Sequence, residues 1–322
     1  MRIVKLKGMK QVNGLHYSPD GRRLLAVGGY EVWSIDEARW VDVIGGTETL
    51  RVLLDASSYA VSPDLTRLAL AHSDATRGLV SLPEVVTFEP TDSAWHEEES
   101  RWREIQIHLV VPNRERQVNA LAVDNTGERF GIAFSMVTAD RSRDDAVRHY
   151  IEDAYLSEPN AHVTGVDQAV SGVVFSPDGT FATIGGERQS VVTVRGANRR
   201  HIPVFPLPTS HFRDFTYSPN GDTLAVTNAK NVLLLPPDLS APRLTLAHPK
   251  QVNAVAFTPD GRRVLTTSTD KLVRVWDVTT GQLVTSYDWN VGVTNAIAVA
   301  PDGLTAAVSG QSGRVVLFDL EG

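Results

Sequence analysis

His248 and Asp270 are the two side chains in this sequence that together suggest proton transfer. A histidine oriented by a carboxylate is a common general base. The rest of the sequence offers little for catalysis. Its nine histidines include no pair at i and i+4, and it has no glycine-rich phosphate loop, repeated carboxylate pair or serine nucleophile motif. The absence of cysteine excludes disulfides, thiolate zinc sites and cysteine nucleophiles. We therefore predict no catalytic residues, no metal site and no cofactor.

The charge balance disfavours nucleic acid as a general partner. The 322 residues include 31 Lys and Arg against 38 Asp and Glu, and the resulting formal net charge of −7 gives no overall attraction to phosphate backbones. No apolar run approaches the roughly 20 residues that span a bilayer, and residues 1–8 are too short and too charged for a signal peptide. We expect a cytoplasmic protein without membrane contact, monomeric by itself.

One pattern recurs along the chain: an apolar residue, a small polar residue, alternating apolar positions and then Ser/Thr-Pro-Asp-Gly. Alternation with a period of two predicts a half-buried strand, and Pro-Asp-Gly predicts a tight turn. A second apolar run follows the turn. Clear copies occupy residues 12–21, 170–179, 212–221, 252–261 and 294–303. Eroded copies occupy residues 59–64, which lack the glycine, and 118–127, which lack the proline.

The spacing of these seven copies indicates a repeat architecture. Their turns lie at Pro19, Pro63, Asn125, Pro177, Pro219, Pro259 and Pro301. Most intervals match the about 40–45 residues of a four-stranded propeller blade, whereas the intervals that end at Asn125 and Pro177 are longer and must contain insertions. We therefore predict an all-β, seven-bladed β-propeller with four-stranded antiparallel blades, formed by residues 1–322 as a single domain.

The segment 246–277 closely resembles a WD repeat. It ends in Trp276-Asp277, as units of that family do, and it has His248 at its start, although Ala247 replaces the usual glycine. The spacing of the copies extends the resemblance over essentially the whole chain, but the other copies are degenerate. Three of them keep only an aromatic residue near the Trp position: Trp33, Tyr150 and Phe318.

The resemblance implies a structural role for the histidine and the aspartate. In WD repeats a His, a Ser or Thr, an Asp and a Trp form a buried hydrogen-bonded tetrad. His248, Asp270 and Trp276 fit three of these positions, and Thr266 or Ser268 fits the hydroxyl position, for which we take Ser268. Each satisfied hydrogen bond stabilises a fold by ~0.5–1.5 kcal/mol. We prefer this interpretation to acid–base catalysis.

The two ends of the chain are predicted to complete one blade together. The last copy supplies only three strands, at residues 295–299, 305–309 and 315–319. Residues 2–7 alternate apolar and basic side chains, so they fit the missing outer strand. Pairing of these segments would close the ring and leave no open edge. WD-repeat propellers use the same kind of closure, which the resemblance therefore also implies.

Two insertions interrupt the regular spacing, near residues 83–104 and 138–160. The first lies between the third and outer strands of the second blade and has Trp95 and Trp102 on either side of an acidic run. These tryptophans either anchor a partner or pack the loop onto its own blade. In the second, residues 147–155 have helical spacing, but the distance to the next turn favours a third strand at 147–151 after a loop at 138–146.

The resemblance also implies a binding surface, because WD-repeat propellers usually bind partners through their top face. Two positions at the start of each inner strand tend to point into it. The inner position is occupied by Asn13, Ser57, Asn119, Ser171, Arg213, Asn253 and Asn295. The position before the first apolar residue is occupied by Gln11, Asp55, Gln117, Ala169, His211, Gln251 and Val293. Such amides either bind a peptide backbone or cap the turn before the strand.

These patterns predict an interaction protein without catalytic activity. The expected partner is a protein or peptide bound at the top face, with Asn13, Asn119, Arg213, Asn253, Asn295, Gln11, Gln117, His211 and Gln251 as the contact residues. Basic residues beside these positions make the top face mildly positive. The alternative is an enzyme or small-ligand binder that uses the central channel, because a fold alone does not determine function.

Overall fold

The described part of the chain is built from β-strands, with one 3₁₀ helix, η1 (Gln311–Gly313). The computed structural model describes residues 1–29, 35–56, 58–62, 65, 67–71, 84–87, 103–104, 116–137, 147–155, 158–166, 169–186, 191–195 and 204–320. Within these residues the strands form seven four-stranded antiparallel sheets, which we number 1 to 7. The predicted four-stranded antiparallel blade is thus confirmed.

In sheets 1 to 3 the strand order across the sheet follows the chain. Sheet 1 contains β2 (Gln11–Tyr17), β3 (Arg23–Gly29), β4 (Ile35–Asp42) and β5 (Thr47–Ala56). Sheet 2 contains β6 (Ser58–Val61), β7 (Arg67–Ala71), β8 (Glu84–Thr87) and β9 (Arg103–Glu104). Sheet 3 contains β10 (Arg116–Val123), β11 (Arg129–Val137), β12 (Val147–Tyr155) and β13 (Glu158–Val166).

Sheets 4 to 6 repeat this order. Sheet 4 contains β14 (Val170–Phe175), β15 (Phe181–Gly185), β16 (Val191–Arg195) and β17 (Val204–Pro206). Sheet 5 contains β18 (Phe215–Tyr217), β19 (Leu224–Asn228), β20 (Asn231–Leu235) and β21 (Leu244–Ala247). Sheet 6 contains β22 (Val252–Phe257), β23 (Arg263–Ser268), β24 (Val273–Asp277) and β25 (Leu283–Tyr287).

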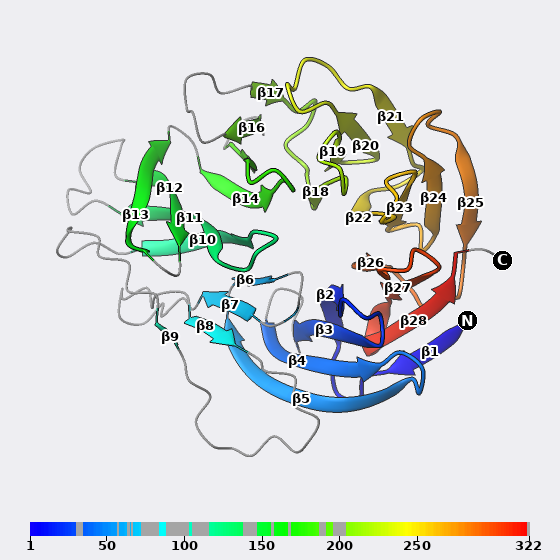
Figure 1. Ribbon diagram of the computed structural model, residues 1–322. Helices are drawn as coiled ribbons and strands as arrows, with labels where there is room; N and C mark the ends of the chain where they lie inside the picture. Colours follow the sequence, from blue (N-terminus) through cyan, green and yellow to red (C-terminus); the bar gives the residue numbers. More distant parts are fainter. Residues whose placement is uncertain are drawn as a thin grey trace.

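Sheet 7 combines the two ends of the chain. It contains β26 (Ile297–Val299), β27 (Thr305–Ser309), β28 (Arg314–Asp319) and, as its outer strand, β1 (Arg2–Lys5). β1 pairs antiparallel with β28, with Ile3 opposite Val316. Figure 1 shows the sheets arranged around a common centre, with the first strand of each nearest to it and β1 beside β28.

The two predicted insertions are bounded by strands. Residues 147–155 form strand β12, so the strand interpretation is confirmed over the helical one. β8 and β9 are the third and outer strands of sheet 2, and the first insertion lies between them as predicted. Residues 88–102, with Trp95 and Trp102, and residues 138–146 lie outside the described residues.

The Ser/Thr-Pro-Asp-Gly segment forms the turn between the first two strands of a sheet. In sheet 6 the Thr258 hydroxyl donates to Asp260 (2.6 Å) and accepts from the Arg263 N–H (3.0 Å). Gly261 follows with a φ of 69°, a left-handed conformation that glycine adopts without steric cost. The hydrogen bond from Thr258 holds the pKa of the Asp260 carboxyl below its usual range. Each side chain of the motif thus has a defined task in the turn.

The hydrophobic core is divided into clusters, each shared by two neighbouring sheets. On β23, Val264 packs in a cluster with residues of sheet 5, whereas the next residue, Leu265, packs in a cluster with residues of sheet 7. Both side chains are fully buried. Successive residues of a strand point to opposite faces, so both faces of sheet 6 are covered by apolar contacts.

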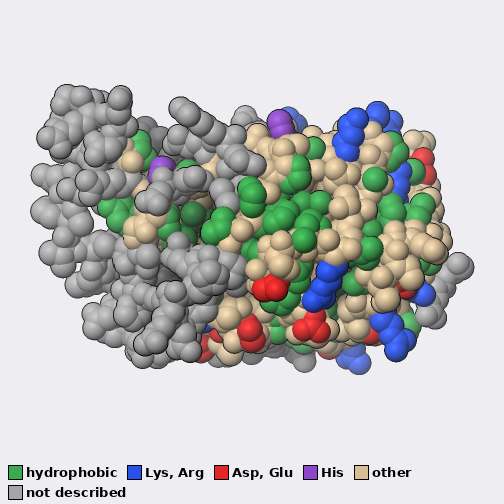
Figure 2. All heavy atoms as spheres, turned by 90° about the horizontal axis from the view of Figure 1, so that it is seen from above, with side chains coloured by type: hydrophobic (Ala, Val, Ile, Leu, Met, Phe, Trp, Pro, Cys, Tyr) green, Lys and Arg blue, Asp and Glu red, His purple; other side chains and the backbone are tan. Residues whose placement is uncertain are grey.

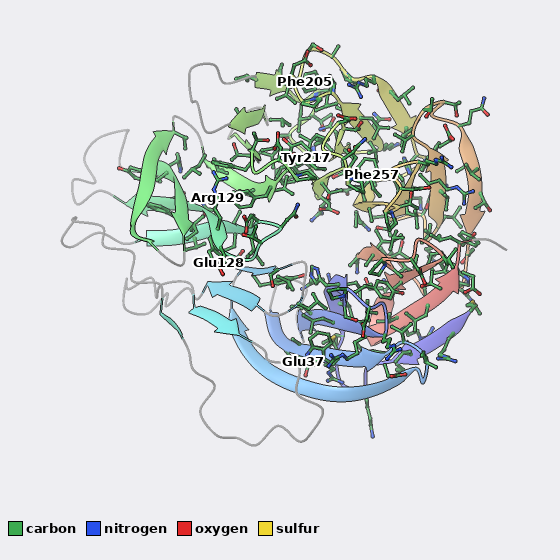
Figure 3. The ribbon with its side chains drawn as sticks, viewed as in Figure 1. Glu37, Glu128, Arg129, Phe205, Tyr217 and Phe257 are labelled. Carbon is green, nitrogen blue, oxygen red and sulfur yellow. The ribbon has the colours of Figure 1, made fainter. Side chains whose placement is uncertain are left out.

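Polar and aromatic contacts also cross from sheet to sheet. The Arg129 guanidinium of sheet 3 lies 5.2 Å from the ring centroid of Phe175 and 5.8 Å from that of Phe181, both in sheet 4. Figure 3 shows Arg129 on the side of sheet 3 that faces sheet 4, and Tyr217 and Phe257 in the crowded regions between later sheets. Neighbouring sheets are therefore held by more than apolar area alone.

Leu65 occupies the glycine position of the eroded turn in sheet 2. Its φ is 55°, and its N–H donates to the Ser62 carbonyl (2.9 Å), as Gly21 does to Ser18 in sheet 1. A left-handed conformation costs a residue with a β-carbon roughly 1–2 kcal/mol. The Leu65 side chain is only 6% exposed and packs with the cluster that contains Trp40 of sheet 1. Burial of the side chain offsets the strain of the turn.

We predict that Leu65→Gly unfolds at higher denaturant concentration than Leu65→Ala, by a stability difference of about 1 kcal/mol. Both variants lose the leucine packing, but only alanine keeps the left-handed strain. The control pair is Leu283→Gly and Leu283→Ala on β25, where the side chain is 48% exposed. Alanine should be the more stable residue there. Equal or greater stability of alanine at position 65 would contradict the strained turn.

Candidate functional site

The antiparallel strand order places two kinds of connection on one face of the molecule. These are the segment before each innermost strand and the turn between each second and third strand. We call this face the top face. Over sheets 5 and 6 its segments are joined by backbone hydrogen bonds, which link Ala229 to His211 (2.7 Å), His248 to Lys230 (2.8 Å), Val252 to Ala229 (2.9 Å) and Thr269 to Gln251 (2.9 Å). This part of the top face is therefore a continuous surface.

Four of the predicted inner positions share a backbone irregularity. In sheets 1, 3, 4 and 6 the pairing of the first two strands shifts by one residue at this point. The residues at the shift are Asn13, Asn119, Ser171 and Asn253. A β-bulge bends its strand and re-aims the side chain at the extra residue. In the sequence, each of these positions is marked by a small polar residue that interrupts the apolar alternation. This pattern predicted the position but not the bulge.

Sheets 5 and 7 place a hydroxyl group at the equivalent point. Thr227 Oγ1 accepts hydrogen bonds from the N–H groups of Arg213 and Asp214, both at 2.9 Å. Ser309 Oγ accepts from the Ala296 N–H (2.8 Å) and donates to the Val12 carbonyl of sheet 1 (3.1 Å). Both hydroxyls form hydrogen bonds with backbone groups that have no partner in the strand pairing.

Two of the predicted contact amides are used inside the protein. Asn253 Nδ2 donates to the Thr294 carbonyl (2.8 Å), and Asn119 Nδ2 donates to Ser135 Oγ (2.7 Å). These bonds support the alternative in which asparagine holds the connection before the strand. Among the other predicted positions with described side chains, His211 and Arg213 are exposed, while Gln11, Asn13, Gln251 and Asn295 are half-buried. The side chain of Gln117 lies outside the described part.

Exposed cations extend the top face beyond the predicted positions. Lys10 and Lys250 precede inner strands, and Lys230 and Lys271 lie in the turns between second and third strands. Sequence analysis missed the last two, because their place depends on where those hairpins turn. Figure 2 shows the molecule edge-on, with Lys and Arg side chains on both rims and most of the visible Asp and Glu side chains towards one of them.

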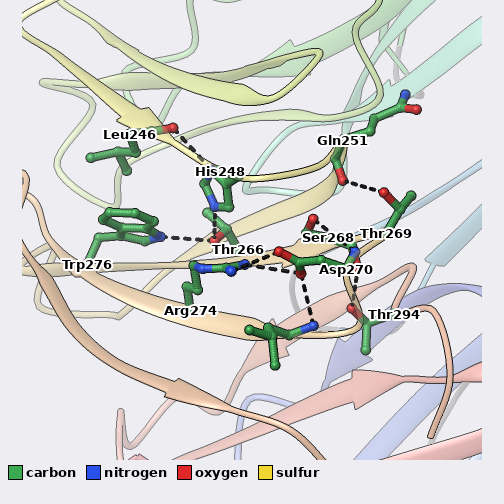
Figure 4. A network of polar contacts seen from close by, with 11 residues as sticks. Leu246, His248, Gln251, Thr266, Ser268, Thr269, Asp270, Arg274, Trp276 and Thr294 are labelled. Carbon is green, nitrogen blue, oxygen red and sulfur yellow. Dashed lines mark hydrogen bonds and ion pairs between the residues drawn. The ribbon is translucent and has the colours of Figure 1, made fainter. Parts of the chain in front are cut away.

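The predicted tetrad forms a hydrogen-bonded chain with a different hydroxyl from the one we assigned. Trp276 Nε1 donates to Thr266 Oγ1 (3.0 Å), which lies 2.8 Å from His248 Nε2 (Figure 4). His248 Nδ1 lies 3.1 Å from the Leu246 carbonyl, to which it can only donate. Nε2 is then the acceptor for the threonine hydroxyl. Thr266, and not Ser268, thus connects the two rings.

The histidine of this chain is suited to structure and not to proton transfer. Burial lowers the pKa of His248 to about 4, so the ring is neutral near pH 7. One of its ring nitrogens has a hydrogen-bond partner in sheet 5, the Leu246 carbonyl, and the other has one in sheet 6, the Thr266 hydroxyl. A general base works best with a pKa near the working pH and with access to a substrate proton. The geometry therefore fits a structural link between sheets 5 and 6.

Asp270 belongs to a separate pair beside this chain. Its carboxylate accepts from Arg274 (3.1 Å) and forms an ion pair with that guanidinium (2.8 Å), and its N–H donates to Ser268 Oγ (3.3 Å). Burial alone would raise the pKa of Asp270, but the hydrogen bond from Arg274 holds it below its usual range. The contacts of Asp270 therefore run to Arg274 and not to His248 as the tetrad predicted. The reason is Arg274, a cation on the next strand.

A further group of titratable side chains lies on the innermost strands and was missed by the sequence analysis. Tyr59 Oη lies 3.2 Å from His16 Nε2, which links sheets 1 and 2. Asp214 of sheet 5 accepts from the Val255 N–H of sheet 6 (2.9 Å). Burial lowers the pKa of His16 to about 4 and raises that of Asp214 to about 6. These groups connect neighbouring inner strands.

Comparison with known proteins gives the repeat a family. A model described as "WD domain, G-beta repeat" matches residues 240–277. The match begins before β21, the outer strand of sheet 5, and ends with β24 of sheet 6, so it contains the Thr266 chain and the Asp270–Arg274 pair. Residues 240–277 of the chain therefore form a WD repeat. The sequence unit of the repeat is offset by one strand from the sheet that it helps to build.

Three curated relatives are similar to parts of this chain. An uncharacterized WD repeat-containing protein of Synechocystis is 25% identical over 144 residues, which is 44% of this chain and 41% of the relative. The small ribosomal subunit protein RACK1 of Neurospora crassa is 33% identical, and MST50-interacting protein 11 of Pyricularia oryzae 32% identical. Each of these two matches spans 75 residues, 23% of this chain and 24% of the relative. The chain thus matches less than half the length of each relative.

The described residues contain no helix with the length and apolar character needed to cross a membrane. They also contain no group of three or more His, Cys, Asp or Glu side chains arranged to hold a metal ion.

We predict that Thr266→Val lowers the free energy of unfolding by about 2–3 kcal/mol, because the indole N–H of Trp276 and the ring of His248 both lose their partner. The matched control is Thr267→Val on the same strand. The Thr267 hydroxyl is buried without a hydrogen-bond partner among the described residues, so this change should be neutral or stabilising. Denaturant titration compares the two variants. Equal losses would contradict the assignment of Thr266 as the connecting hydroxyl.

Proposed function

We propose that this WD-repeat protein is a non-catalytic scaffold that docks a protein or peptide on its top face. The observation that carries the proposal is the different use of the two sets of polar residues. His248 and Asp270, the pair that suggested chemistry, are bonded to residues of sheets 5 and 6. His211 and Arg213, by contrast, are exposed on the top face. Charged and polar groups presented on a rigid surface suit recognition.

The names of two relatives support assembly with other macromolecules. One is named for its interaction with MST50, and another as a protein of the small ribosomal subunit. We extend only the general role, interaction, to this chain. Our expectations of a cytoplasmic location, a monomeric state and no membrane or general nucleic-acid partner stay predictions.

We further propose that residues 1–322 form one seven-bladed propeller that β1 closes. Shared apolar clusters support this. Val4 of β1 and Val315 of β28 pack with Val12 and Leu24 of sheet 1, so the last sheet and the first share a core. The Ser309 hydroxyl also donates to the Val12 carbonyl across the same junction. A closed ring gives the docking surface a rigid support.

The alternative function, catalysis or small-ligand binding at the centre, has one observation in its favour. Asp214, with its raised pKa, and the His16–Tyr59 pair lie on innermost strands. Each group already has a hydrogen-bond partner on a neighbouring sheet. We therefore interpret these residues as links between sheets and keep the scaffold as the proposed function.

Closure predicts that substitutions at two neighbouring residues of β1 lower stability by very different amounts. Val4 is 5% exposed and Ile3 is 48% exposed. Val4→Asp should lower stability by about 3 kcal/mol or more, because it buries an unpaired carboxylate, and should promote association through a freed edge. Ile3→Asp should cost about 1 kcal/mol or less. Thermal melting and size-exclusion chromatography measure both effects. Similar behaviour of the two variants would argue against closure by β1.

The docking surface is tested by comparing a double variant on the top face with a double variant on the opposite face. His211→Ala with Arg213→Ala should weaken binding of the partner about tenfold, on the order of 1.4 kcal/mol, with little change in melting temperature. Arg22→Ala with Arg262→Ala changes exposed residues of the opposite face and should leave binding intact. Quantitative affinity capture from the native cell, followed by titration of the recovered partner, gives both values. Normal binding by the His211 and Arg213 variant would refute a top-face site.

A further inference from the structure

We propose that a cationic patch on the top face of sheets 5 and 6 binds an acidic peptide segment of the partner. The patch consists of Lys230, Lys250 and Lys271, with His211 and Arg213 at its border, all exposed. This inference rests on the proposed function, because it names the chemical class of the group that docks there. It goes beyond that function by assigning the contact to two sheets and to carboxylates.

The three lysines lie on segments that touch one another. Lys230 directly follows Ala229, whose carbonyl accepts from the Val252 N–H two residues beyond Lys250. The Lys230 carbonyl accepts from the His248 N–H. Gln251, next to Lys250, accepts through its carbonyl from Thr269, two residues before Lys271. Three separate connections therefore present their lysines side by side.

The positive charge of this patch is not cancelled locally. The ammonium groups of Lys230, Lys250 and Lys271 have no ion pair recorded among the described residues. Asp270, the acid next to Lys271, is paired with Arg274 inside the sheet. Asp214 is half-buried and bound to the Val255 N–H. Asp288, in the connection after β25, is the exposed acid on this side of sheet 6. The patch therefore keeps a net positive charge despite the overall −7 of the chain.

The composition of the patch favours carboxylates over nucleic acid. Single-stranded nucleic acids are usually bound by aromatic side chains that stack on the bases beside cations. Trp276 is buried here in the Thr266 chain, and Phe212 packs against the sheet 4–5 cluster. Lysine is a flexible point charge, and an extended peptide presents every second side chain on one side, roughly 7 Å apart. Flexible ammonium groups tolerate such a row of carboxylates without exact geometry.

Fluorescence anisotropy with a labelled glutamate-rich peptide tests the proposal. The full-length protein should bind this peptide with an affinity that falls as salt is added, because the contacts are exposed charge pairs. The combined change Lys230→Glu, Lys250→Glu and Lys271→Glu should weaken binding at least about tenfold. The control Lys5→Glu, Arg22→Glu and Arg262→Glu changes the net charge equally at exposed positions outside the patch and should keep the affinity. Lysine-to-glutamine variants serve if the reversal lowers the melting temperature.

A glutamine peptide and a single-stranded RNA test whether the site is specific for carboxylates. The capture result for the His211 and Arg213 variant separates failure of this inference from failure of the proposed function. The same peptide with glutamine in place of glutamate should not bind, and a single-stranded RNA should bind more weakly than the acidic peptide. Equal binding of the glutamine peptide, stronger binding of RNA, or unchanged binding by the lysine variant would overturn the acidic-peptide site. Lost partner capture by the His211 and Arg213 variant together with no peptide binding overturns this inference alone. Normal capture by that variant overturns the proposed function instead.

Discussion

The constraint on which this structure depends is that each sheet has two apolar faces and can cover neither by itself. Val264 and Leu265 are neighbours on β23, yet they are buried against different sheets. Leu24 and Leu25 on β3 divide in the same way between sheets 7 and 2. A unit of this kind buries its surface only by stacking on neighbours. Burial of apolar area therefore requires the sheets to follow one another, and the remaining interactions work within that arrangement.

Because apolar packing holds each pair of neighbouring sheets together, the polar groups between the sheets can differ from one pair to the next. Sheets 5 and 6 are linked by Asp214 and the Val255 N–H, and sheet 6 is linked to the segment before sheet 7 by Asn253 and the Thr294 carbonyl. The Thr266 chain adds a second link, which runs from Trp276 of sheet 6 through His248 to the Leu246 carbonyl of sheet 5. A satisfied hydrogen bond contributes ~0.5–1.5 kcal/mol, whichever groups form it. This explains how copies without the full set of repeat residues still form four-stranded sheets.

The turn motif and its spacing were enough to predict the four-stranded sheets, because the motif acts locally: Thr258, Asp260 and Gly261 bond among themselves and their next neighbours. The candidate site was predicted less completely. From the sequence alone, Thr266 and Ser268 are equally good candidates for the hydroxyl of the tetrad. The contacts that each hydroxyl makes depend on Trp276 and Arg274, which lie on the neighbouring strand β24. The bulges and the turn lysines were missed for the same reason. Strand register and hairpin ends depend on pairing between segments, which a single sequence does not state.

The charge on the two faces follows from the same burial constraint. Since both sides of each sheet are covered, charged residues concentrate in the connections at the ends of the strands. On the face opposite the top, the Ser/Thr-Pro-Asp-Gly turns use their carboxylates for structure, as hydrogen bonds from Ser18 and Thr258 hold the pKa values of Asp20 and Asp260 below their usual range. The top connections carry no such motif. They are free to present lysines, so an acidic chain displays exposed cations over sheets 5 and 6 of its top face.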